Sequence, residues 1–151
     1  MSPEKIKQQI EYVSPENSAE DGILRNHEFN LIINGKKVGG AEVHYFSAPL
    51  PIYQLSELYV DFEEKGKGYA SQLLDRVETF LKERKKPGIL TDAIFEGDPA
   101  SGMYERHGWK KIPSDLNLMV YNWPDDVSPD ILIGYPNRQR DMLDRMEDRN
   151  N

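Results

Sequence analysis

Hydrophobic and polar residues alternate along the first half of the chain in the pattern of β-strands. The turn pair Asn34-Gly35 suits a type I′ hairpin turn, because both central residues of that turn need positive φ. A second pair, Gly39-Gly40, lies inside the returning strand and indicates a bulge or a close backbone approach. We expect strands at residues 6–13, 28–33, 38–46 and 52–60.

The period changes to that of a helix after residue 69. One apolar face is formed by Ala70, Leu73, Leu74, Val77, Phe80 and Leu81. Pro87-Gly88 is expected to end this helix, and a mostly apolar strand follows at 89–95. The order strand, helix, strand predicts a right-handed crossover with a parallel strand pair.

A second helix is indicated by Asp98 as its cap, Pro99 at its first position and Gly108 at its end. Trp109 and residues 116–123 are expected to supply the last strands. We therefore expect one domain over residues 1–123. Residues 124–151 form an extension that is charged and partly helical, interpreted as a solvated helix, a helix docked on the domain or a homodimer contact.

Composition narrows the function classes. The chain has no cysteine, which excludes disulfides, thiolate catalysis and zinc–thiolate sites, and no pair of its three histidines has metal-ligand spacing. No apolar run is long enough to span a bilayer, and residues 1–5 lack the apolar stretch of a secretory signal. We expect a cytoplasmic protein without a metal and without a membrane partner.

The net charge of −7 argues against nucleic acid as a partner, because neutralising phosphates needs clustered Lys and Arg. The acidic surface either keeps the protein soluble or raises the local concentration of a cationic acceptor. Both interpretations stay open from the sequence.

A glycine-rich loop between the strand at 52–60 and the following helix carries the most specific signal. Glycines let the backbone approach a ligand, and the free N–H groups of a helix N-terminus bind anions. We expect a phosphate or pyrophosphate at residues 65–70. The loop fails the P-loop pattern because Tyr69 follows Gly68, and it fails the dinucleotide pattern because Ser71 stands at the third glycine position.

The segment Lys65-Gly66-Lys67-Gly68-Tyr69-Ala70 resembles the Arg/Gln-x-x-Gly-x-Gly/Ala signature of the GNAT superfamily of N-acetyltransferases, with Lys in the Arg/Gln place. The strand end Glu57-Leu58-Tyr59-Val60 is similar to the strand that leads into that loop. The segment 100–109 is similar to the second family motif, A-x-x-L-Y-E-K-x-G-F. Gly97 stands where the family often has Asn. Together the resemblance covers residues 28–123.

The resemblance implies an α/β (α+β) fold with a mixed, mostly antiparallel sheet that is splayed at a parallel βαβ pair and flanked by helices. It implies acetyl-CoA as donor, its pantetheine arm bound along Leu58, Tyr59 and Val60 and its pyrophosphate at residues 65–70. It also implies direct attack by an amine without an acyl-enzyme; transfer through a serine is the alternative.

Tyr104 occupies the family's tyrosine position, and a phenol stays protonated at neutral pH, so it is the candidate acid for the departing thiolate. Its alternative role is packing. Glu57 is the candidate base, with a solvated strand residue as its alternative; His44 is a weaker candidate. The helix dipole explains His107 without chemistry. Tyr12 and Tyr45 are candidates for lining an acceptor pocket.

We therefore predict an acetyl-CoA-dependent N-acetyltransferase whose acceptor is a small-molecule or peptide amine. The alternatives are a non-catalytic acyl-CoA-binding sensor module and an unrelated α/β domain that binds a nucleotide at the loop. The sequence does not choose the acceptor.

Overall fold

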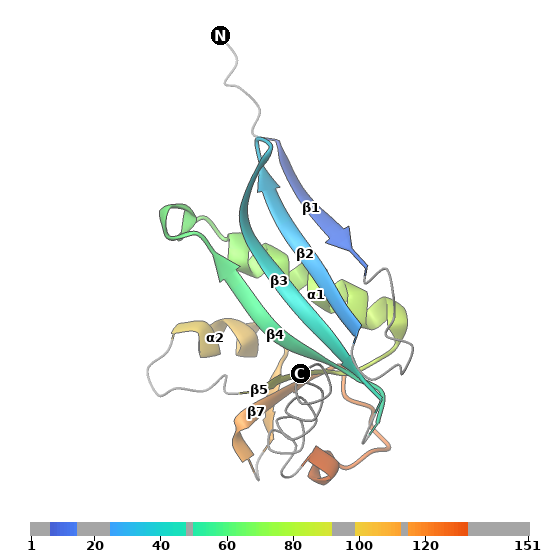
Figure 1. Cartoon of the computed structure of the whole chain (residues 1–151). Coiled ribbons are helices and arrows are strands. Elements are labelled where there is room, and N and C mark those ends of the chain that lie inside the picture. The colour runs from blue at the N-terminus through green and yellow to red at the C-terminus, as the bar shows by residue number, and fades with distance from the viewer. Residues whose placement is uncertain (1–6, 15–24, 48–49, 92–98, 113–114, 133–151) are drawn as a thin grey trace, which may run out of the picture.

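One mixed sheet with helix α1 behind it organises the molecule (Figure 1). The computed structural model describes residues 7–14, 25–47, 50–91, 99–112 and 115–132. The strands are β1 (Gln8–Val13), β2 (Arg25–Ile33), β3 (Lys36–Phe46), β4 (Ile52–Val60), β5 (Gly88–Thr91), β6 (Lys110–Ile112) and β7 (Asp115–Tyr121). Their order in the seven-stranded sheet is β1-β2-β3-β4-β5-β7-β6. The helices are α1 (Tyr69–Arg84) and α2 (Pro99–Arg106), with 3-10 turns η1 (Phe62–Glu64) and η2 (Pro129–Leu132).

The β2–β3 hairpin confirms the turn prediction. Asn34 and Gly35 have φ values of 51° and 82°, the positive values that a type I′ turn needs. The ladder between β2 and β3 shifts register beside Leu31. A Cβ atom on Gly39 would lie 2.7 Å from the backbone oxygen of Tyr59, so the close backbone approach is confirmed there.

The centre of the sheet opens between β4 and β5. These strands are parallel, as the strand–helix–strand order predicts. In the described part of the chain they pair only at Tyr53–Gly88 and Gln54–Ile89, while β4 continues to Val60. All other strand pairs are antiparallel. The expected fold class, a mostly antiparallel sheet splayed at a parallel crossover pair, is confirmed.

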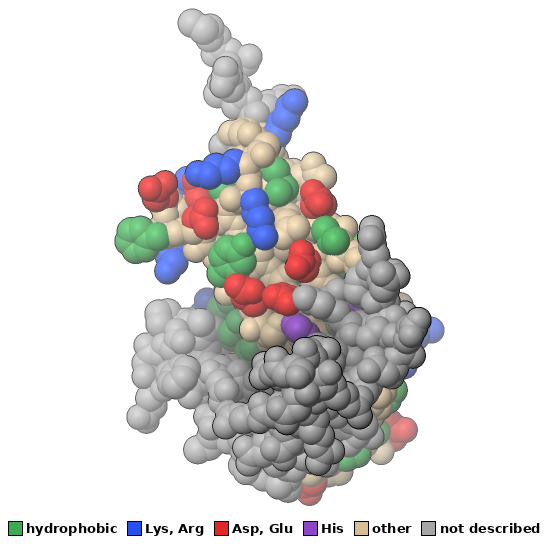
Figure 2. All heavy atoms as spheres, viewed as in Figure 1, with side chains coloured by type: hydrophobic (Ala, Val, Ile, Leu, Met, Phe, Trp, Pro, Cys, Tyr) green, Lys and Arg blue, Asp and Glu red, His purple; other side chains and the backbone are tan. Residues whose placement is uncertain are grey.

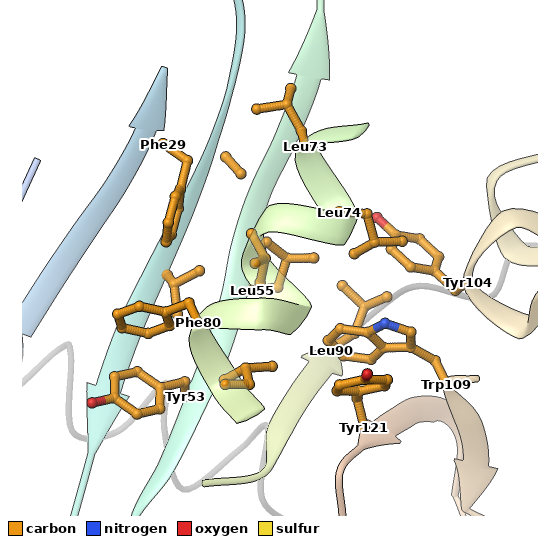
Figure 3. Packing of buried hydrophobic residues seen from close by; sticks show 14 of the residues in the cluster. Phe29, Tyr53, Leu55, Leu73, Leu74, Phe80, Leu90, Tyr104, Trp109 and Tyr121 are labelled. Carbon is orange, nitrogen blue, oxygen red and sulfur yellow. The ribbon is translucent and has the colours of Figure 1, made fainter. Parts of the chain in front are cut away.

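Helix α1 packs on one face of the sheet and forms the larger core (Figure 3). Fully buried members of this core include Phe29, Leu31, Leu73, Leu74 and Leu81. Burying each such side chain contributes about 1.5–3 kcal/mol. The helix ends at Arg84, before Pro87, because Lys85 adopts the left-handed conformation and closes it with N–H bonds to the last turn.

A second core cluster joins β3, β4, β5, β6 and β7 to η2. Its buried residues are Phe46, Ile52, Ile89, Ile112, Leu118, Val120 and Leu132. Because Leu132 is fully buried there, the first part of the segment after residue 123 packs on the domain.

Several expectations fall outside the described residues: most of the loop 14–22, Asp98 as a helix cap, the strand end at 92–95 and the segment 133–151. Strand β5 is described as far as Thr91. Among the described helices, none has the length and apolar character needed to cross a membrane.

Candidate active site

A groove of about 1130 Å³ runs from the free end of β4 past the glycine loop to α2. The residues that the loop and the first turn of α1 contribute are Lys65, Gly66, Gly68, Tyr69, Ala70 and Ser71. Helix α2 contributes Met103, Tyr104 and Arg106. The structure therefore brings the two sequence motifs together on one concave surface.

The glycine loop has the backbone that an anion site needs. Gly66 and Gly68 have φ values of 84° and 81°. Gly68 is the N-cap of α1, and a Cβ atom added at either glycine would meet no atom within 4 Å. The first backbone N–H groups of a helix have no partner within the helix, so those of Tyr69 and Ala70 are available to a ligand in the groove.

The two loop lysines differ in their surroundings. Lys67 Nζ lies 2.7 Å from Glu64 Oε2, and this hydrogen bond raises the pKa of Lys67 above its ordinary value. Lys67 is not among the residues that line the groove. Lys65 lines it, with its ammonium 5.6 Å from the centre of the exposed Phe62 ring. Lys65 is therefore the loop cation available to a phosphate.

Strand β4 divides its residues between the two faces of the sheet. Leu58, Tyr59 and Val60 line the groove. Glu57 is exposed, and it lies opposite Glu42 of β3. It is not among the groove residues, so the structure does not bring it together with Tyr104.

Glutamates form a row across the sheet face that looks away from α1. Glu28 lies opposite Glu42, and Glu42 lies opposite Glu57, on three adjacent strands. Figure 2 shows acidic side chains on this face. His44 is half-buried, with Nε2 3.1 Å from Glu42 Oε1.

Tyr104 is held in place by the core. It is 8% exposed and lines the groove, and its ring meets the edge of Trp109 at a centroid distance of 5.9 Å. Figure 3 shows Tyr104, Trp109 and Tyr121 gathered at the α2 end of the core. Further along the groove, a hydrogen bond from Lys82 to Tyr121 raises the pKa of Lys82.

A hydrogen-bonded cluster on the groove wall was missed by the sequence reasoning. His107 Nδ1 lies 2.7 Å from Glu78 Oε1 and 3.3 Å from Asp75 Oδ1, and His107 Nε2 lies 2.8 Å from Ser71 Oγ. Trp109 Nε1 donates to Glu78 Oε2 at 3.1 Å. His107 therefore has specific partners on α1 in addition to its position at the end of α2.

The signal for this cluster was a glutamate inside an apolar helix face. Glu78 is four residues after Leu74 and three before Leu81, and it is buried with them. Asp75, Glu78 and His107 offer ligand atoms within 4.8 Å of one another, close enough to share a cation. The spacing of histidine pairs does not detect such a mixed group.

The other tyrosine candidates lie away from the groove. Tyr12 and Tyr45 are partly buried against the α1 core. Tyr12 Oη lies 2.6 Å from Nδ1 of the buried His27. The Tyr45 ring packs on Tyr53 at 5.1 Å.

Solved structures share this architecture at low sequence identity. An Escherichia coli GNAT family N-acetyltransferase, YhbS, solved with CoA, is 16% identical with a TM-score of 0.58, over 89% of each chain. A GNAT family acetyltransferase of Staphylococcus aureus is 20% identical, with a TM-score of 0.52, over 63% of this chain and 66% of that one. Arabidopsis thaliana Naa50, solved with a CoA-peptide bisubstrate analogue, is 15% identical with a TM-score of 0.54, over 64% of this chain and 72% of that one.

The comparison with curated protein sequences finds no match. The family model of the acetyltransferase (GNAT) domain matches residues 25–111, more than half of the chain. This range contains both motifs, the glycine loop and most of the groove. The chain belongs to the GNAT acetyltransferase family.

Proposed function

We propose that the protein is an N-acetyltransferase that takes an acetyl group from acetyl-CoA and passes it directly to an amine. The observation that carries the proposal is the continuous groove. It joins the N-terminus of α1, where the N–H groups of Tyr69 and Ala70 have no partner within the helix, to Tyr104 and the free end of β4. The CoA complex of YhbS and the bisubstrate complex of Naa50 support this donor.

Each part of the donor meets suitable chemistry. The pyrophosphate is an anion, which suits the N–H groups of the first turn of α1 and the ammonium of Lys65. The pantetheine arm carries amides, which suit the backbone of Leu58, Tyr59 and Val60, where β4 has left β5. No metal is part of the proposal.

The transfer forms a bond between the amine nitrogen and the acetyl carbon and breaks the bond between that carbon and sulfur. The phenol of Tyr104 is the proposed proton donor to the departing sulfur. Glu57 is the proposed acceptor of the amine's proton from the opposite face of the sheet, through water. Alignment of the two substrates in one site lowers the barrier further.

The acceptor is proposed to be a small-molecule or peptide amine that reaches the reaction centre as a cation. The row Glu28, Glu42 and Glu57 supports a cationic acceptor, because neighbouring carboxylates attract an ammonium group.

The test is release of free CoA from acetyl-CoA in the presence of a panel of amines, read with a thiol reagent. Because the chain contains no cysteine, the reagent reports CoA alone. We expect CoA release only when an acceptor amine is added. A stoichiometric burst of CoA without amine would instead indicate an acyl-enzyme. Tight CoA binding with no transfer to any amine would support the non-catalytic sensor module.

A further inference from the structure

Glu78, His107 and Ser71 form one line of hydrogen bonds on the wall of the groove. Glu78 Oε1 lies 2.7 Å from His107 Nδ1, and the opposite ring nitrogen lies 2.8 Å from Ser71 Oγ. Ser71 directly follows the glycine loop and stands in the first turn of α1. The line therefore starts at a buried carboxylate and ends at the proposed phosphate site.

The partners of His107 fix the position of its hydrogen. Nδ1 faces Glu78 and Asp75, and ionised carboxylates can only accept hydrogen bonds. Nδ1 therefore carries a hydrogen in both charge states of the ring. The neutral and the protonated ring therefore differ only in whether Nε2, which faces Ser71, carries a hydrogen.

The charge of the ring decides what Ser71 offers to a ligand. In the neutral ring Nε2 is an acceptor, so it takes the hydroxyl hydrogen of Ser71, and Oγ presents only lone pairs to the groove. Phosphate oxygens are repelled by that arrangement. In the protonated ring Nε2–H donates to Oγ, and the hydroxyl hydrogen is free to point at an anionic oxygen.

We infer that binding of a phosphate-bearing ligand in the groove draws one proton from solvent onto His107, which turns Ser71 into a hydrogen-bond donor to the phosphate. His107 is then a positioning residue that acts through Ser71, and Glu78 holds its ring. The inference rests on the proposed function, since acetyl-CoA is the ligand that brings the phosphates.

The charges that face His107 favour this proton uptake. Glu78 and Asp75 approach it from α1, the first with a buried side chain and the second 68% exposed. Two cations oppose them: Arg106 of α2 and Lys82 of α1 line the same groove, and Lys82 interacts with both carboxylates. Adding a phosphate to two carboxylates makes the local charge more negative, so a proton on the ring lowers the repulsion.

The test is calorimetric titration with acetyl-CoA at pH 8 in HEPES and in Tris, buffers with different heats of ionisation and no phosphate. We expect the binding heat to depend on the buffer with uptake of up to about one proton per site. A binding heat that is the same in both buffers would overturn the inference while leaving the proposed function intact; absence of acetyl-CoA binding would overturn both.

Variants separate this role from simple packing. His107→Gln should remove the buffer dependence, and Ser71→Ala should lower both affinity and proton uptake. Ser71→Thr keeps a hydroxyl and should restore them. Ser56→Ala is the matched control, because Ser56 is exposed and its hydroxyl bonds to the backbone oxygen of Glu42, away from the groove. Unchanged proton uptake in His107→Gln would contradict the inference.

Discussion

Two glycines of this chain share the same left-handed backbone conformation but lie in different surroundings. Substituting each of them in turn therefore tests whether the glycine loop binds the phosphates of the ligand. Gly35 and Gly68 have φ values of 82° and 81°, and a Cβ atom at either would meet no atom within 4 Å. Gly35 lies in the β2–β3 turn, whereas Gly68 lines the groove as the N-cap of α1.

Replacement of each by alanine should cost similar stability. A residue with a Cβ atom destabilises the folded state by about 1–2 kcal/mol in a left-handed conformation. Alanine also lowers the conformational entropy of the unfolded chain, which offsets about 0.4–1 kcal/mol of that loss. We expect the free energy of unfolding to fall by about 1 kcal/mol in both variants, or about 2–4 °C in Tm. Urea denaturation and thermal melting measure this.

Acetyl-CoA binding should separate the two variants. We expect the methyl group of Gly68→Ala to project into the proposed pyrophosphate site and to separate the ligand from the N–H groups of the first turn. Each hydrogen bond to a charged group contributes about 1.5–3 kcal/mol. Loss of one such bond weakens binding about 10- to 100-fold. Gly35→Ala should bind as the unaltered protein does. Equal affinities of Gly68→Ala and Gly35→Ala would refute the placement of the phosphate.

Three further predictions concern the acid, the buried network and a tyrosine. Tyr104→Phe should leave acetyl-CoA affinity unchanged and lower the rate of acetyl transfer, measured as CoA release, by about 100-fold or more. A transfer rate equal to that of the unaltered protein would show that Tyr104 serves only in packing. Glu78→Ala should lower the free energy of unfolding by about 1–3 kcal/mol in urea denaturation, because it leaves the buried Trp109 N–H without its acceptor and removes the nearer carboxylate from His107 Nδ1. The exposed Glu83→Ala should change it by less than about 0.5 kcal/mol, and equal effects would contradict the network. Burial raises the pKa of Tyr53, so the folded state keeps the phenol proton to a higher pH than the unfolded state, and the free energy of unfolding should fall as the pH rises above about 10. Tyr53→Phe should make this fall less steep. An unchanged dependence of the free energy of unfolding on pH would contradict the role of Tyr53.

The features that the sequence predicted correctly follow from local residue patterns or from the order of the elements along the chain. Asn34-Gly35 set the hairpin turn, because positive φ at both positions is a property of those residues. The glycine loop was predicted next to the N-terminus of a helix, and the structure has Gly68 as the N-cap there. The parallel pair followed from the order of the elements.

The features that were missed depend on contacts between distant parts of the chain. His107 meets Ser71 and Glu78 across 36 and 29 residues, and no local pattern brings α2 against α1. From the sequence alone, Glu78 only interrupts the apolar face of the helix, and its role depends on buried partners that are distant in the chain. The orientation of Glu57 also required the register of β4 on β3, which a bulge between Glu42 and Val43 shifts.

The central claim is that the groove is built for acetyl-CoA. The most direct measurement is calorimetric titration of the purified, folded protein with acetyl-CoA, with ATP and NAD in parallel. We predict saturable binding of acetyl-CoA at one site per chain and much weaker binding of ATP and NAD. ATP or NAD binding as tight as that of acetyl-CoA, or no binding of acetyl-CoA, would contradict the claim.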